Sequence, residues 1–335
     1  MRIKTSRLLA VSFVATLAVA AYSQLAPNGV PIVNAAPVNI IVTNTNDSGA
    51  GSLRAALATA NGNGNPADTD TITFDINADA PGDVVIEPLT PLTVTQRVLI
   101  NGYSQGDAQA NTAVWPNPFN GLLRVTIDGS TAGSMEVTGN NVTIQGINFA
   151  NSTDADVTVT GAANFHFYGN YTGTTPNGME RGRDDIVPTR SLILDDTSNA
   201  VVGGTTGSAR NIFGFCALNC IEVRGSANTG TEILGNYVGL ASDGVTSLDT
   251  TYFSSYGANR QAAVVILGDA SDVTIGGSAS GAGNSFEHNA EGAIFGQDSS
   301  NISILGNRIL YNLANNGPQK TGISFQGVTN STIGG

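Results

Sequence analysis

The chain has few charged residues, and basic residues are the scarcest of them. Of its 335 residues only 12% are charged, with 14 Lys and Arg against 26 Asp and Glu, so the formal net charge is −12. Nucleic-acid phosphates are bound by clustered Lys and Arg. Three of the basic residues, Arg2, Lys4 and Arg7, lie at the extreme N-terminus. The composition therefore argues against a nucleic-acid partner.

Long hydrophobic runs are missing except near the start of the chain. The apolar run Leu8 to Ala21 follows the basic start, and small residues at Ala21 and Ser23 fit a signal-peptidase site. A spanning helix needs roughly 20 apolar residues, and this run is shorter. We expect a signal peptide over residues 1–23, cut as late as residue 35. The mature chain is then secreted or displayed at the cell surface, without a membrane span.

Cysteine is nearly absent. Cys216 and Cys220 are the only two, and three residues separate them. In an oxidising compartment this spacing allows a disulfide, while two reduced thiols fit the sequence equally well. A metal site is disfavoured because the only histidines, His166 and His288, belong to other segments.

Helix-forming stretches are also scarce, and a short motif recurs in their place. An apolar strand leads to a turn centred on Asn or Asp, and a second strand follows it. The spacing is 29 residues from Asp272 to Asn301, from Asn301 to Asn330, and from Asn199 to Asn228. Such a period filled with strands is typical of a β-solenoid. We expect one corner column containing Asn141, Asn164, Asn199, Asn228, Asp272, Asn301 and Asn330.

The strand before each corner alternates with period two, as expected when one face points inward. The residues seven and five positions before the corner are apolar, and they include Leu192, Leu194, Ile221, Val223, Val265, Leu267, Ile323 and Phe325. The Asn301 copy is shifted by one, to Ala293 and Phe295, which we interpret as an insertion. A second corner recurs at Asn170, Asn211, Asn236, Asn284 and Asn307. Each coil therefore has three strands, whereas a β-sandwich would show hairpin spacing.

Residues 36–62 are expected to form an N-terminal cap. Ser52 is a favourable helix N-cap, and Leu53, Ala56, Leu57 and Ala60 would share one apolar face. A short amphipathic helix suits the open end of a solenoid. The β-helix should then occupy residues 63–335. We expect it to continue past Gly335, because that residue directly follows a corner turn.

The same element carries a family resemblance. The stretch resembles the N-terminal element of exported bacterial right-handed parallel β-helix proteins, whose hallmark is Cys-Ser-Leu-Arg-Glu-Ala. Ser52, Leu53, Arg54 and Ala56 match it, while Gly51 and Ala55 replace the Cys and the Glu. Segments 70–74, 99–105, 121–130 and 235–244 are similar to these proteins too. The resemblance spans residues 40–335. It implies a pectate-lyase-like, right-handed parallel β-helix on an adhesin-like surface or secreted protein, without a defined activity.

Four charged residues are the best candidates for chemistry or binding: Asp195, Asp196, Glu222 and Arg224. Asp195 and Arg224 each precede a predicted corner by four residues, so they should stack roughly 5 Å apart on adjacent coils. A surface ion pair of this kind contributes ~0.2–1 kcal/mol. The following coil is expected to place Gly268 there, which ends the cluster. We therefore interpret the four residues as structural or as weak ligand contacts.

Two functions follow from these features. The favoured one is a non-catalytic scaffold for adhesion or for contact with polysaccharide, a host surface or a neighbouring cell. The alternative is a polysaccharide lyase or glycoside hydrolase. A lyase would need Ca²⁺ ligands with a basic residue, and a hydrolase would need paired carboxylates.

No cofactor is expected. Calcium could be attracted by Asp68, Asp70, Asp75, Asp79 and Asp83, but these residues lack the spacing of a calcium loop and are expected to lie in solvated turns. Segment 241–261, rich in Ser, Thr and Tyr, is the expected contact loop.

Overall fold

The structure is a computed structural model. It describes residues 36–63, 68–77, 84–131, 133, 135–182, 190–248, 262–289, 292–310, 312 and 322–334, and the backbone of β1 (Gln24–Leu25) and β2 (Pro31–Ile32). The expected signal peptide at residues 1–23, the later cut at residue 35 and residues 249–261 of the expected contact loop lie outside the described residues.

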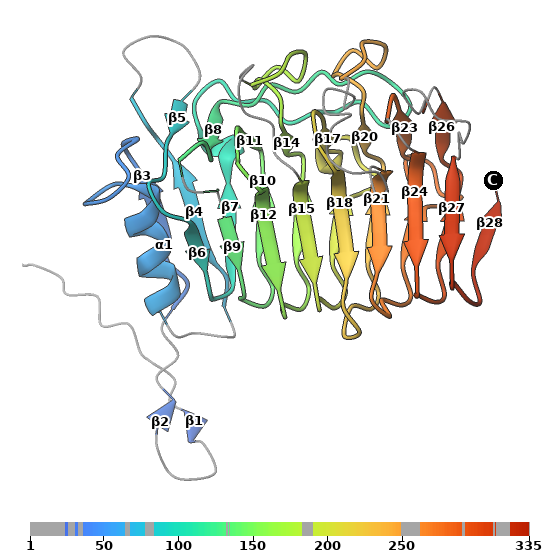
Figure 1. Ribbon diagram of the computed structural model, residues 1–335. Coiled ribbons are helices and arrows are strands. Elements are labelled where there is room, and N and C mark those ends of the chain that lie inside the picture. The colour runs from blue at the N-terminus through green and yellow to red at the C-terminus, as the bar shows by residue number, and fades with distance from the viewer. Residues whose placement is uncertain are drawn as a thin grey trace, which may run out of the picture.

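Three parallel sheets run side by side along the molecule (Figure 1), which confirms the all-β parallel β-helix. Sheet 1 contains β3 (Asn39–Val42), β4 (Asp70–Phe74), β7 (Val98–Asn101), β10 (Thr143–Gln145), β13 (His166–Tyr168), β16 (Val201–Gly203), β19 (Glu232–Leu234), β22 (Thr274–Gly276), β25 (Ser303–Leu305) and β28 (Thr332–Gly334). Sheet 2 contains β5 (Val84–Ile86), β8 (Val125–Asp128), β11 (Ile147–Ala150), β14 (Tyr171–Thr172), β17 (Ile212–Phe213), β20 (Tyr237–Val238), β23 (Ser285–Glu287) and β26 (Arg308–Leu310). Sheet 3 contains β6 (Leu92–Val94), β9 (Met135–Val137), β12 (Ala155–Thr160), β15 (Arg190–Asp195), β18 (Asn219–Arg224), β21 (Ala262–Leu267), β24 (Gly292–Gln297) and β27 (Ile323–Gln326).

The inward rows of sheet 3 build the core. Leu192 and Leu194 pair with Ile221 and Val223, and all four are fully buried. The row then continues through Val264 and Ile266, and through Ile294 and Gly296, in direct register with Ile323 and Phe325.

This register corrects two predictions. Val265 and Leu267 were expected to point inward, and so were Ala293 and Phe295, but each pair is one residue away from the inward row. The extra residue lies in the turn between Leu267 and Asp272, and β24 is in direct register with β27, so the predicted insertion before Asn301 does not exist. A spacing count cannot distinguish a longer turn from a shifted strand.

The first corner column lies between sheets 3 and 1. Six of its predicted members have positive φ, between 52° and 58°: Asn141, Asn164, Asn199, Asp272, Asn301 and Asn330. This left-handed conformation is one that Asn and Asp tolerate. Their side chains also connect adjacent coils, since the Asn164 amide donates to Asn141 Oδ1 at 3.0 Å and the Asn301 amide to Asp272 Oδ1 at 3.0 Å.

Asn228 does not belong to this column, which corrects the seventh assignment. Thr229 bridges Ser198 and Ser271, so Gly230, with φ of 69°, takes the corner position. Asn228 is instead buried, and its amide donates to the Leu194 carbonyl at 3.0 Å. The interval of 29 residues from Asn199 was a coincidence, because this coil is two residues longer than the regular ones.

The second corner, between sheets 1 and 2, holds a continuous ladder of asparagines, which are buried except for the half-buried Asn307. Its members are Asn170, Asn211, Asn236, Asn284 and Asn307. The Asn236 amide, for example, donates to the Val202 carbonyl at 3.0 Å and to Asn284 Oδ1 at 3.0 Å. Turns leave backbone groups without strand partners, and this ladder supplies those partners inside the molecule.

Helix α1 (Leu53–Gly62) lies at the N-terminal end of the coil stack (Figure 1). The Ser52 hydroxyl accepts from the Ala55 N–H at 3.2 Å, which caps the helix. Leu53, Ala56, Leu57 and Ala60 are buried against the core. Strand β3 precedes the helix and pairs with β4, so the sheet begins at Asn39 rather than after residue 62 as predicted.

A long connection crosses the outside of sheet 2. After β7, a 3-10 turn (η1, Gly102–Ser104) leads into residues 105–123, here named the strap, before the chain returns to β8. In Figure 1 the strap is the teal trace that extends toward β23. The Trp115 indole donates to Ser285 Oγ at 3.0 Å, and the Tyr237 hydroxyl donates to the Pro116 carbonyl at 2.7 Å. The strap therefore fastens several coils together.

Arg210 is the buried centre of the strap contacts. It follows a short 3-10 turn (η2, Gly207–Ala209) and its side chain is fully buried. The guanidinium lies 4.2 Å from the centre of the Phe119 ring and 4.7 Å from that of Tyr237. It donates to the carbonyls of Ala113 at 2.7 Å and of Asn117 at 2.9 Å. A second apolar cluster forms around these rings, outside the coil.

Candidate functional site

The predicted charged residues lie on the outward face of sheet 3, on β15 and β18. The register places Asp195 opposite Arg224, as the alternation of the two strands requires. Arg224 Nη2 lies 2.8 Å from Asp195 Oδ2, and Arg224 Nη1 lies 2.7 Å from Glu222 Oε1. The structure thus brings three of the four predicted residues together.

Arg190 completes this cluster, and the sequence analysis missed it. Its Nε lies 2.7 Å from Glu222 Oε2, and its Nη1 lies 3.0 Å from Asp154 Oδ1. Asn219 also donates to Glu222 Oε2, at 3.1 Å. The available signal was the shared spacing of Arg190 and Asn219 at the starts of two paired strands, which becomes visible only once the register is known.

Glu222 is the central carboxylate, with its side chain only 6% exposed. Burial acts to raise its pKa, but hydrogen bonds from Arg190, Asn219 and Arg224 prevail, and the pKa lies below its ordinary value. Both carboxylate oxygens accept hydrogen bonds from cations. A carboxylate held ionised in this way suits cohesion between coils and is a poor proton donor.

Asp196 does not join the cluster. It occupies the turn after β15 with φ of 51°, and its Oδ1 accepts from the Ala227 N–H of the next coil at 3.0 Å. The contact ties one turn to the next, so Asp196 acts as a corner residue.

The charged cluster ends at β21, but the prediction that Gly268 ends it was wrong. Leu267, and not Gly268, lies opposite Arg224, and Val265 lies opposite Glu222. All residues of β21 are apolar. On the described face the charges therefore form a patch two to three coils deep.

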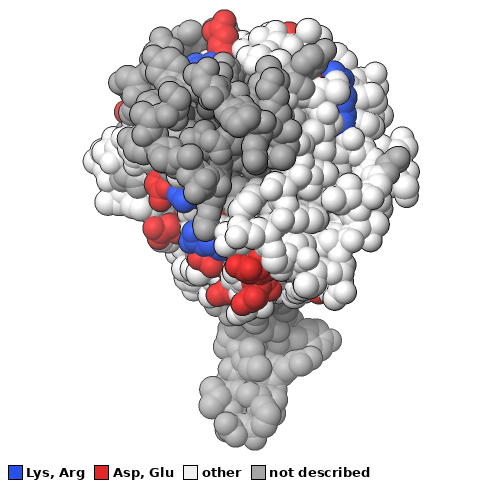
Figure 2. All heavy atoms as spheres, turned by 45° about the vertical axis from the view of Figure 1, so that its right-hand side comes forward, with Lys and Arg blue, Asp and Glu red and all other residues white. Residues whose placement is uncertain are grey.

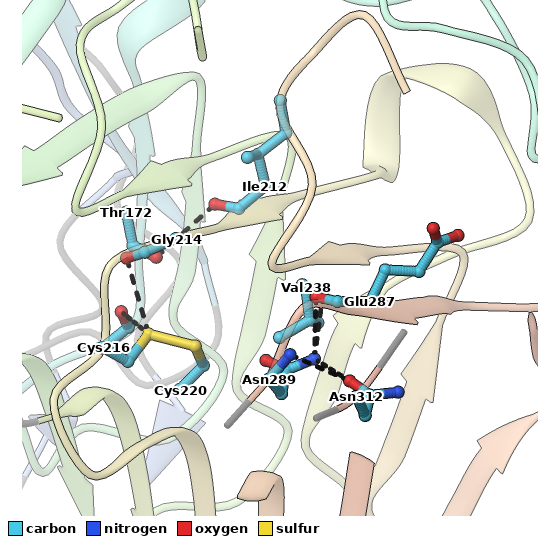
Figure 3. The surroundings of a disulfide bond; sticks show 10 residues. Thr172, Ile212, Gly214, Cys216, Cys220, Val238, Glu287, Asn289 and Asn312 are labelled. Atoms are coloured by element: carbon cyan, nitrogen blue, oxygen red, sulfur yellow. Dashed lines mark hydrogen bonds between the residues drawn. A yellow bond between two sulfur atoms is a disulfide. The ribbon is translucent and has the colours of Figure 1, made fainter. Parts of the chain in front are cut away.

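Cys216, in the loop between β17 and β18, forms a disulfide with Cys220 of β18 (Figure 3). Both residues are nearly fully buried. Figure 3 also shows Asn289, whose amide donates to Asn312 Oδ1 at 2.9 Å. The disulfide and this amide pair both lie where sheet 2 turns toward sheet 3. The disulfide closes a short loop at this corner and so restricts the conformations of the chain there.

A groove of about 540 Å³ that was not predicted from the sequence lies on the outside of sheet 1. It follows the ends of β10, β13, β16 and β19 and is bordered by Tyr103 and Ala110, from η1 and the strap. Tyr168 of β13 lines it and stacks on His166, with ring centres 5.2 Å apart. The sequence signal that could have located the groove is the pair of outward aromatic residues, His166 and Tyr168, two positions apart on one strand.

The rings around the groove are held in place. The Tyr103 hydroxyl donates to the Gly169 carbonyl at 2.9 Å, and burial raises its pKa above the ordinary range. Burial also raises the pKa of Tyr168, and the negative charge of Glu232 raises it further. Burial lowers the pKa of His166, so the imidazole beside Tyr168 is neutral near pH 7.

Neither a metal cluster nor a membrane-spanning helix is found among the residues that the structure describes. No three His, Cys, Asp or Glu side chains of this part of the chain could together hold a metal ion. Its helices are also too short or too polar to cross a bilayer. The Asp70 carboxylate accepts from the Val38 N–H at 2.8 Å and from the Asn63 amide at 2.8 Å.

Comparison with known proteins gives little beyond the geometry. No protein-family model matches the chain, and no curated protein matches its sequence. Among solved structures, it is similar to PfbA, a surface adhesin of Streptococcus pneumoniae, at 11% identity over 88% of this chain and 91% of that one, with a TM-score of 0.30. A similarity of that size carries no argument about what this chain does.

Proposed function

We propose that this protein is an exported β-helix scaffold that contacts polysaccharide at a cell surface without cleaving it. The observation that carries the proposal is the charged cluster on β15 and β18. Its central carboxylate, Glu222, is held by two arginines and by Asn219. The residues best placed for lyase or hydrolase chemistry are thus engaged in joining adjacent coils.

The surface supports the contact role. Figure 2 shows charged side chains of both signs gathered mainly in the lower part of the face drawn, with wide areas of uncharged residues elsewhere. Stacked coils repeat similar outward positions along one axis. Such a surface offers many weak, regularly spaced contacts to a chain of repeating sugar units.

The test is to incubate the purified chain with neutral and with acidic polysaccharides, in calcium and in chelator. Binding is measured by co-sedimentation with insoluble polysaccharide, and cleavage by the absorbance of unsaturated products and by reducing ends. We expect binding without product. Calcium-dependent release of unsaturated sugar, abolished by Glu222→Gln, would establish the lyase alternative instead.

Export is tested separately. Expression of the full chain in a secreting host, followed by determination of the N-terminal residue of the product, should give a start after residue 23 or as late as 36. A product that begins at Met1 and stays inside the cell would contradict the surface role.

A further inference from the structure

The groove on sheet 1 is a candidate binding site, and it is separate from the charged cluster on sheet 3. Its volume, about 540 Å³, falls within the roughly 300–1,000 Å³ typical of small-ligand sites. It crosses four successive coils, from β10 to β19. An occupant could therefore be extended along the solenoid axis, as the sugars of a polysaccharide are.

The aromatic side chains give the groove a rigid platform. His166 stacks on Tyr168 with an angle of 18° between the rings, and His166 does not line the groove. The Tyr168 ring is thus packed against His166 on one side, and Tyr168 also lines the groove. Tyr103 is fixed by its hydrogen bond to the Gly169 carbonyl. Amphipathic rings of this kind pack against the C–H face of a sugar and can still form a polar contact.

Polar residues line the same groove as Tyr168. Thr205, Thr206 and Ser208 line the groove and are exposed, and Gln145 lines it from β10. Gly204 also lines the groove, and a Cβ at this position would lie only 2.9 Å from Ala209 Cβ, so a larger residue does not fit there. Hydroxyl and amide groups beside an apolar ring match the alternating C–H and O–H groups of a pyranose.

Charge selects among saccharides. None of the described residues that line the groove is charged. Glu232 lies close enough to raise the pKa of Tyr168, and the whole chain carries a formal charge of −12. A polyanionic chain would be repelled by this field and would meet no cation among the described lining residues. A neutral glycan meets neither obstacle.

We propose that this groove binds a neutral glycan, with Tyr168 as the stacking platform and Gln145, Thr206 and Ser208 as hydrogen-bonding partners of the sugar hydroxyls. The proposal rests on the proposed function, since it names the site and the ligand class of the polysaccharide contact. It makes Tyr168 the residue on which affinity depends most, as buried aromatic anchors usually are.

The test uses the full chain and titrates it calorimetrically with soluble neutral glycans, dextran, galactan and glucomannan, and with polygalacturonate. We expect Tyr168→Ala to weaken the binding of a neutral glycan at least about tenfold. Tyr168→Phe, which keeps the ring, should stay within about threefold. Thr143→Ala is the matched control, because Thr143 lies opposite His166 on the same outward face without lining the groove, and it should bind as the parent chain does.

The outcomes separate the two proposals. If the parent chain binds a neutral glycan and Tyr168→Ala binds it equally well, with an unchanged melting temperature, the groove assignment is wrong while the proposed function stands. If polygalacturonate alone binds, the assignment to a neutral ligand is wrong. If none of the four polysaccharides binds here and none co-sediments with the chain, the proposed function fails and the groove proposal fails with it.

Discussion

At the scale of single residues, the same side-chain type has different roles at the two corners. Asn199 is exposed and adopts positive φ at the first corner, whereas Asn236 is fully buried at the second and bonds the backbone of its neighbours. Asn199 thus allows the backbone conformation of its corner, whereas Asn236 supplies hydrogen bonds to the buried backbone. Substitutions should therefore have very different effects at the two ladders.

We predict that Asn236→Ala lowers the free energy of unfolding by about 3 kcal/mol, because it removes partners from the buried backbone at several points. Asn199→Gly should change it by less than about 0.5 kcal/mol, since glycine adopts positive φ freely. Gly230 already occupies that column. Equilibrium unfolding in urea measures both. Equal losses in the two variants would contradict the distinction between the ladders.

Asp156 on β12 gives a second prediction at this scale. It is fully buried, and among the described residues neither of its oxygens makes a hydrogen bond of ordinary geometry. Burial raises its pKa to about 7, with Ser152 and Ser191 close enough to oppose the rise and Asp128 adding to it.

The sign of the pH dependence follows from this pKa. The folded chain keeps the proton up to about pH 7, whereas the unfolded chain releases it near the ordinary value of 3.8. The folded state thus binds more protons between these values, and the free energy of unfolding falls as the pH rises through them, by up to roughly 4 kcal/mol. Asp156→Asn should lose this contribution. The difference between the two chains in urea titrations from pH 4 to 8 isolates it, and parallel curves would contradict the buried acid.

At the scale of elements, the strap is the feature that distinguishes this molecule from a plain stack of coils. The strap begins after β7, leaves the stack of coils and reaches Ser285 on β23. Arg210 and Tyr237 hold it in between. Most contacts in a solenoid join neighbouring repeats. The strap adds contacts that skip several coils.

We predict that Arg210→Met loosens the strap, because it removes three hydrogen bonds to main-chain carbonyls and the stacking on two rings. Methionine keeps the unbranched apolar part of the arginine side chain, so the loss reports mainly on the guanidinium. The amides of residues 105–123 should exchange with deuterium at least about tenfold faster. Arg308→Met, at an ion pair on the outside of β26, is the control and should leave strap exchange unchanged. Unchanged exchange in Arg210→Met would show that the strap is held by its apolar contacts alone.

At the scale of the whole molecule, the N-terminal end of the core is covered by α1. Ala56 is buried against the first coils, whereas Ala58 on the same helix is exposed. We predict that Ala56→Asp lowers the melting temperature by several degrees and promotes association through the uncovered parallel edge. Ala58→Asp should do neither. Light scattering during a thermal melt compares the two, and identical behaviour would show that the helix does not cover the core.

The features that recur in every coil could be predicted from the sequence, whereas the features that occur once could not. The intervals between Asp272, Asn301 and Asn330 identified the coil because regular coils impose one period. Asn228 was misplaced because the coil that contains it is longer, and periodicity carries no information about turn length. Arg190 entered the charged cluster through register alone. The strap depends on pairs such as Trp115 and Ser285, 170 residues apart, which no local pattern encodes.

The strap also sets how the molecule would respond to a pull on its ends. A solenoid without such a connection yields one coil at a time, each releasing a short length of chain at low force. Here the coils between β7 and β23 are bridged from outside, so the last of them cannot peel away before the contacts of Trp115, Tyr237 and Arg210 give way. In a force-extension experiment the bridged coils should open together in one large step, while the coils beyond β23 come off in small ones. A protein built in this way would behave as a rigid rod up to a threshold load.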